Sequence, residues 1–177
     1  KPGEVTWKAV ARAEASGVRE FRGLLRNGLA GEELPSICLV PARPKGRVVV
    51  WVDGAGKEGL GQRAADGSWK WSPAVSRLLD KGHVVLGVDL FLQGEFLADG
   101  QPVRQTRRVK NERESAAYTF GYNPSLFAQR VQDLLSGLSW VRSSEASAVV
   151  GQVNWLGAVG FGEAAPWVLA ARAVAGG

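Results

Sequence analysis

Unbroken apolar runs along the chain predict a set of buried β-strands. They are residues 33–42 around ICLV, residues 47–52 (RVVVWV) and residues 83–90 (HVVLGVDL). Each run is bounded by turn-forming residues, and the last two are rich in β-branched side chains, which is typical of strands buried on both faces of a parallel sheet. A later run, residues 153–161 (VNWLGAVGF), predicts one more strand.

Helical patterns separate these strands. Residues 72–82 have Ser72 as a candidate N-cap, Pro73 at the first helical position and Gly82 beyond the end. Residues 123–143 and 163–175 predict two further helices, and the apolar face of the first contains Leu126, Phe127, Val131, Leu134, Leu135 and Leu138. The pattern is indecisive near the N-terminus: residues 3–17 are helical or irregular, and residues 18–27 are a helix or a strand.

The order of these elements predicts an α/β fold with a mostly parallel, twisted sheet flanked by helices and joined by right-handed crossovers. The chain has 177 residues, of which 45% are hydrophobic and 22% charged, which suits a single domain over residues 1–177. A long loop is expected over residues 91–122.

The composition argues against several kinds of partner and site. No stretch has the roughly 18 consecutive apolar residues of a membrane span, so no membrane partner is expected. The single cysteine, Cys38, excludes an internal disulfide and is expected to be buried. With only one histidine besides, we expect no transition-metal site and no cofactor.

The positive charge is concentrated in one segment. The net charge is +5, and the excess lies mainly in VRQTRRVK at residues 103–110. A nucleic-acid groove interleaves basic and aromatic residues, and this segment has no aromatic residue. We therefore expect an exposed, solvated loop rather than a specific nucleic-acid site.

Three loops follow the predicted parallel strands: DGAGK at 53–57, DLFLQGEF at 89–96 and GFGEA at 160–164. Ligands of open α/β sheets bind at the carboxyl ends of the strands, so these loops are expected to converge at one edge. The candidate site residues are Asp53, Gly54, Ala55, Lys57, Asp89, Gly162 and Glu163. The segment GAGKEG lacks the spacing and the Ser or Thr of a phosphate-binding loop.

From about residue 19 to residue 177, the chain resembles the N-terminal half to two-thirds of an α/β-hydrolase of the acetyl xylan esterase or dienelactone hydrolase type. The segment GFGEA resembles the nucleophile elbow G-x-S-x-G, although its pattern alone fits a plain strand-to-helix turn equally well. Asp53–Gly56 resembles the H-G-G-G oxyanion loop. Gly82, Asp89 and Gly94 match a third hydrolase segment, in which the next strand ends in an Asp.

This resemblance implies that Gly162 stands at the nucleophile position and cannot attack an ester. It places one oxyanion donor at the N–H of Glu163 and the other in the Gly54–Ala55 region. In such enzymes the acid and the histidine follow the nucleophile, whereas no Asp or His follows Gly162. The only histidine, His83, begins a strand and is expected at the opposite edge, so no Ser-His-acid triad can be assembled in the usual order.

Two roles remain open for the carboxylates of this region. Asp53 and Glu163 could share the pocket as an acid–base pair, or Glu163 could instead stabilise a helix N-terminus through the helix dipole. The spacing of the two residues requires neither role.

Three functions follow as alternatives. The first is an inactive hydrolase-fold domain with a structural or ligand-binding role, whose ligand would be a carbohydrate or small ester. The second is an active esterase completed by residues outside this chain, and the third is a polyanion- or nucleotide-binding domain that uses Lys57 and the basic loop. The esterase resemblance favours an extracellular or periplasmic location.

The chain contains no methionine, so we expect it to lie within a longer precursor. In the hydrolase topology, residues 153–161 would be left as an exposed apolar edge, which promotes aggregation. We therefore expect the domain to be incomplete. Its sheet would be completed by a missing C-terminal part of the same protein or by a second chain.

Overall fold

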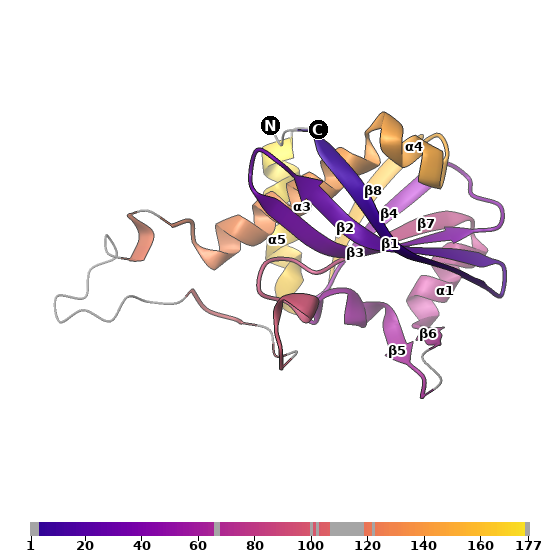
Figure 1. Ribbon diagram of the computed structural model, residues 1–177, viewed down its shortest axis with the longest axis horizontal. Coiled ribbons are helices and arrows are strands. Elements are labelled where there is room, and N and C mark those ends of the chain that lie inside the picture. The colour runs from indigo at the N-terminus through magenta and orange to yellow at the C-terminus, as the bar shows by residue number, and fades with distance from the viewer. Residues whose placement is uncertain are drawn as a thin grey trace.

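A computed structural model describes residues 4–65, 68–99, 101, 103–106, 119–121 and 123–175. Its centre is a six-stranded sheet in the order β1-β2-β3-β7-β4-β8 (Figure 1). The strands are β1 (Val5–Ala15), β2 (Val18–Asn27), β3 (Glu32–Pro41), β4 (Arg47–Val52), β7 (His83–Val88) and β8 (Trp155–Gly160). The predicted α/β class and the strands at 33–42, 47–52, 83–90 and 153–161 are confirmed, with shifted ends.

The sheet is mixed rather than mostly parallel. Strands β7, β4 and β8 are parallel neighbours, whereas β1, β2, β3 and β7 pair antiparallel in succession. The expectation of helical or irregular structure at residues 3–17 is wrong over β1. Its Ala, Glu, Lys and Arg content favours a helix locally, but nearly every residue of β1 pairs with β2, and this long-range pairing overrides the propensity.

Within the described residues, the α-helices with complete bounds are α1 (Pro73–Asp80), α3 (Leu126–Val141), α4 (Ser144–Val150) and α5 (Ala165–Ala175), and they pack beside the sheet. The predicted N-terminus of α1 is confirmed: the hydroxyl of Ser72 accepts the N–H of Val75 at 3.3 Å, and Pro73 is the first residue of the helix. Helix α4 and the small hairpin β5 (Gly61–Arg63) with β6 (Trp69–Trp71) were not anticipated. Phe127, placed on the apolar face of α3 by the pattern, is exposed. Short 3-10 turns are η1 (Gly56–Leu60), η2 (Gly94–Phe96) and η3 (Gly162–Ala164).

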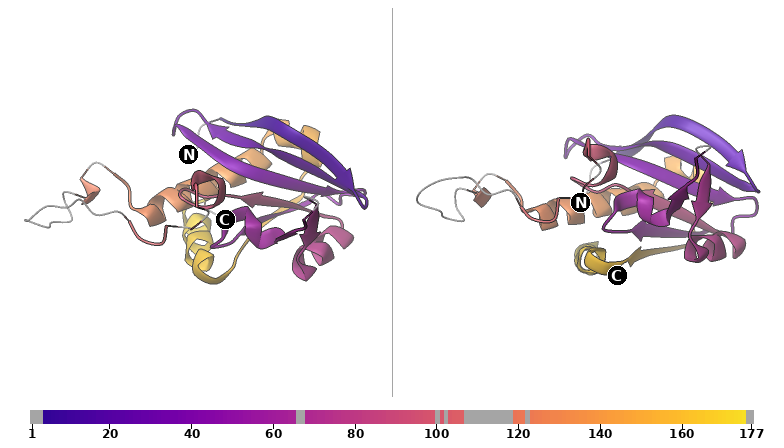
Figure 2. Two further views of the ribbon diagram at one scale, coloured as in Figure 1. Left: turned by 60° about the horizontal axis from the view of Figure 1, so that its bottom comes forward. Right: turned by 90° about the horizontal axis from the view of Figure 1, so that it is seen from below.

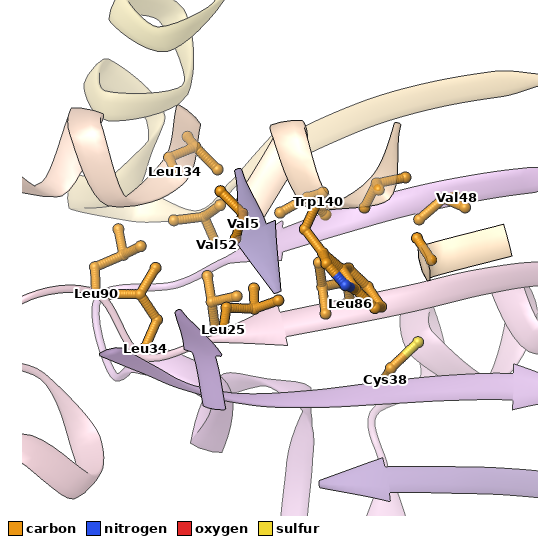
Figure 3. Close-up of a cluster of buried hydrophobic side chains, with 14 of the residues drawn as sticks. Val5, Leu25, Leu34, Cys38, Val48, Val52, Leu86, Leu90, Leu134 and Trp140 are labelled. Carbon is orange, nitrogen blue, oxygen red and sulfur yellow. The ribbon is translucent and has the colours of Figure 1, made fainter. Parts of the chain in front are cut away.

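Hydrophobic clusters cover both faces of the sheet. The larger lies between the sheet and α3, α4 and α5, and includes Leu25, Val50, Leu134, Trp140 and Trp167 (Figures 2 and 3). The smaller lies under α1 and η1, around Ile37, Leu39, Trp51, Leu60 and Val75. Cys38 is fully buried in the larger cluster, as expected. Burial raises the pKa of its thiol to about 12, which keeps it protonated and unreactive.

Strand β8 lies at one edge of the sheet, where β4 is its only partner among the residues described. No residue of β8 is buried, whereas all of β4 except Arg47 is buried. Helix α5, which follows β8, exposes Leu169 and Val174. None of the helices described is long and apolar enough to cross a membrane.

Candidate functional site

An open hollow of about 690 Å³ lies at the carboxyl ends of β4 and β8. Its lining consists of Asp53, Gly54, Ala55, Gln101, Arg104, Phe161, Gly162 and Glu163. Two of the three loops predicted to converge therefore meet in this hollow. The third loop contributes no residue to the lining, and Asp89 at its start is buried. Lys57, at the end of the first loop, is buried as well.

The first loop bends back on itself directly after β4. The carboxylate of Asp53 accepts the N–H of Ala55 at 2.9 Å, and the Asp53 carbonyl accepts the N–H of Gly56 at 3.1 Å. The side-chain amide of Gln93 donates to the carbonyls of Asp53 at 3.1 Å and Gly54 at 2.8 Å. Gln93 is itself fully buried, so its side-chain amide is held in place by the surrounding packing and fixes the loop backbone.

Asp89 connects this loop to the one after β7. Its buried carboxylate accepts the backbone N–H of Lys57 at 2.8 Å and that of Glu95 at 3.0 Å, and it pairs closely with the Lys57 ammonium group. Glu95 also pairs with Lys57, at 2.7 Å. Gly56 has a φ of +67°, and a Cβ there would collide with the Asp89 carboxylate, so both the bend and the close approach require glycine.

The turn after β8 begins where the N–H of Phe161 donates to the carbonyl of Val52 at 3.0 Å. Gly162 follows with a φ of +54°, and a Cβ there would meet nothing within 4 Å. A Cβ on Gly54 would lie 2.6 Å from Oε1 of Glu163, which places that carboxylate against the first loop. Arg104 lies 3.9 Å from the same carboxylate oxygen and is largely exposed.

Phe161 contributes an aromatic wall. Its ring stacks on the buried ring of Trp51 with centroids 4.2 Å apart, and it is 39% exposed. Because Trp51 belongs to the smaller core cluster, the orientation of Phe161 is coupled to the packing under α1. The hollow thus combines an aromatic surface, two carboxylates, one guanidinium group and exposed loop backbone.

Sequence reasoning missed two buried charges that hold the segment after β7. Arg130 donates to the carbonyls of Phe91, Leu92 and Val103, and its guanidinium group stacks on the ring of Trp167. Asp133 accepts the N–H of Phe91 at 2.6 Å. Both follow the helical period of α3, but the same pattern fits a solvated helix face, so nothing in the sequence marks them as buried.

Burial raises the pKa of Asp133 to about 7, although its hydrogen bond from Phe91 and the charge of Arg130 act in the opposite direction. The nearby charge of Glu32 also raises this pKa. Burial has the opposite effect on Arg130 and lowers the pKa of its guanidinium group. Both groups anchor the segment after β7, and burial disfavours the charged form of each.

His83 begins β7 and Asp89 follows its end, so the histidine lies at the opposite end of the strand from the hollow, as the sequence indicated. Desolvation, followed by the charges of Arg47, Lys81 and Lys45, lowers its pKa. Across the described ranges, no group of three or more His, Cys, Asp or Glu side chains is arranged to hold a metal ion. Of the basic segment, residues 107–110 lie outside the described residues.

No family model matches the chain, and no curated protein matches it by sequence. Solved structures resemble it in fold. A glucuronoyl esterase from Solibacter usitatus superposes with a TM-score of 0.59 at 10% identity, over 97% of this chain and 49% of the esterase. The chain shares the fold of an esterase. Acetyl xylan esterase 1 from Thermoanaerobacterium sp. JW/SL YS485 has a TM-score of 0.59 at 14% identity, over 95% of this chain and 48% of its own. The chain thus spans about half the length of these esterases.

Proposed function

We propose that the chain is a non-catalytic esterase-like domain whose hollow binds a ligand without cleaving it. The observation that carries the proposal is Gly162. It lies in the turn between β8 and α5, with a positive φ and open space at its Cβ. On the proposed resemblance, this is the turn where α/β-hydrolases carry their nucleophile. In the proposed domain this turn has the backbone of a nucleophile elbow without its reactive side chain, so covalent acyl transfer would have no starting point.

The groups around Gly162 do not replace a triad. His83 lies at the far end of β7, away from the hollow. Asp53 and Glu163 line the hollow, but one oxygen of the Asp53 carboxylate already accepts the N–H of Ala55. The geometry thus favours binding over general acid–base catalysis.

The proposed ligand is a carbohydrate or a small ester. The structural neighbours are named for glucuronoyl and acetyl xylan esterase activities, and the lining of this hollow suits a sugar. Sugar hydroxyls donate to carboxylates such as those of Asp53 and Glu163, while the exposed ring of Phe161 offers an apolar surface to the C–H face of a sugar ring.

Proton NMR with an acetylated xylo-oligosaccharide tests both halves of the proposal. Saturation transferred from the protein to the oligosaccharide is expected, and the acetyl signals should remain intact over hours. Release of free acetate in proportion to the amount of protein would contradict the proposal. A Phe161→Ala variant should weaken the transfer, whereas Leu169→Ala, on the exposed face of α5 away from the hollow, should leave it unchanged.

A second candidate is an esterase completed by groups outside this chain. The specific observation in its favour is the space at Gly162, which would accommodate a serine side chain. If a histidine and an acid are supplied from elsewhere, Gly162→Ser should gain hydrolytic activity; if they are not, the variant should stay inert. The buried, doubly paired Lys57 argues against the polyanion-binding alternative.

We also propose that β8 pairs with a further parallel strand supplied by another segment of polypeptide. Strands β7, β4 and β8 form a continuous parallel ladder, and β8 has one pairing edge left with half-buried residues along it. A strand added there would extend the sheet and shield the adjoining apolar surface of α5. Concentration-dependent association in light scattering is the expected result for the chain without such a strand. A chain that stays monomeric at all concentrations would contradict the proposal.

A further inference from the structure

At the wall of the hollow, the N–H of Ala55 is a hydrogen-bond donor that already has an acceptor within the chain. Ala55 lines the hollow, and its N–H donates at 2.9 Å to the carboxylate of Asp53, two residues earlier. A carboxylate of the chain thus occupies the position that an anionic group of a ligand would take to reach this donor.

The donor does not depend on Asp53 for its orientation. Gln93 holds the carbonyls of residues 53 and 54, and Asp89 holds the N–H of Lys57 on the other side of Ala55. Both anchors are fully buried. If the Asp53 carboxylate were absent, the backbone would remain fixed and the Ala55 N–H would stay directed as it is.

The position of the Asp53 side chain is also fixed. A Cβ at Gly59 would collide with the Asp53 side chain, so the carboxylate packs against the backbone of η1. Glu163 adds a second carboxylate to the hollow, and Arg104 is the one cation in the described lining. The fixed charges of this lining therefore sum to a negative value, which disfavours an anionic ligand.

We propose that Asp53 is a specificity-determining residue that excludes anions from the hollow by occupying the Ala55 N–H. The inference rests on the proposed binding function and deepens it: the hollow accepts neutral, hydroxyl-bearing ligands and refuses carboxylates such as acetate. Two effects contribute, occupancy of the donor and negative charge, and variants can separate them.

The test is a titration with acetate, monitored through the amide NMR chemical shifts of Ala55 and its neighbours. Asp53→Ala removes both the charge and the acceptor, and should bind acetate about tenfold more tightly than the wild type, because a charge-assisted hydrogen bond becomes available. Asp53→Asn removes the charge but keeps an oxygen for the Ala55 N–H. Glu163→Gln removes a charge of the same hollow that makes no bond to this N–H. Both controls should change the affinity by less than about threefold.

Equal gains in Asp53→Ala and Glu163→Gln would overturn the inference, since charge alone would then explain them. Amide exchange in the wild-type protein provides a test that needs no variant: the Ala55 N–H should exchange more slowly than that of an open loop, and unprotected exchange would refute the bond. Neither failure affects the proposed lack of ester hydrolysis, which a hydrolysis assay measures separately.

Discussion

Replacing Asp89 by Asn should destabilise the protein more than any exposed charge substitution. The Asp89 carboxylate is completely buried and accepts the N–H groups of Lys57 and Glu95 in addition to the Lys57 ammonium group. An asparagine has one acceptor oxygen and would turn its NH₂ group toward the remaining donors. The substitution also leaves the Lys57 ammonium group buried beside a neutral side chain.

Removing one partner of a buried pair costs about 3–5 kcal/mol, because the other charge stays desolvated. Glu95 still pairs with Lys57 at 2.7 Å, so we expect the lower end of the range, about 3 kcal/mol. With a urea m-value of about 1–3 kcal/mol/M, the unfolding midpoint should fall by about 1–3 M.

Urea unfolding followed by far-UV circular dichroism measures this loss, and Glu95→Gln is the matched control. It removes the other partner of the same ammonium group, but the Glu95 side chain is 66% exposed, so it should cost less than about 1 kcal/mol. A loss below about 1 kcal/mol for Asp89→Asn, or equal losses for the two variants, would refute the claim that Asp89 holds the two loops together.

The remaining predictions concern backbone geometry and pH. Gly56→Ala should lower stability by about 1–3 kcal/mol in thermal unfolding, because the site requires a positive φ and a Cβ would collide with Asp89. Gly137→Ala, within α3 and with nothing within 4 Å of its Cβ, should instead raise stability by up to about 1 kcal/mol. The raised pKa of Asp133, about 7 in the folded protein against an ordinary 3.8, means that the folded state binds the proton more tightly, so its contribution to stability should fall as pH rises from about 4 to 7. Asp133→Asn keeps an acceptor for Phe91 and should flatten this slope; an unchanged slope would show that other groups cause it.

The central strands and helices could be predicted because their signals are local. The β-branched run of β4 and the Ser72-Pro73 start of α1 specify strand and helix without help from distant residues. Strand β1 could not be predicted in this way, because its partner is the neighbouring β2 and its own composition favours a helix. Antiparallel pairing of β1, β2 and β3 likewise depends on tight turns rather than on an apolar pattern.

The site was predictable in outline and not in detail. The rule that ligands bind at the carboxyl ends of parallel strands brings Asp53 and Glu163 to the same hollow, where both lie. The same rule placed Lys57 and Asp89 in the site, but they are buried, pair with each other and do not line the hollow. Whether a charged residue lines a pocket or supports it depends on side-chain packing, which spacing along the chain does not specify.

Hydrolysis of p-nitrophenyl acetate by the wild-type protein, corrected for the buffer rate, tests the central claim most directly. Because Gly162 places no side chain in the hollow, the expected rate equals that of buffer and does not saturate with substrate. A saturable rate that scales with protein concentration and survives repurification would contradict the account, since it would require a reacting group that the described site does not contain.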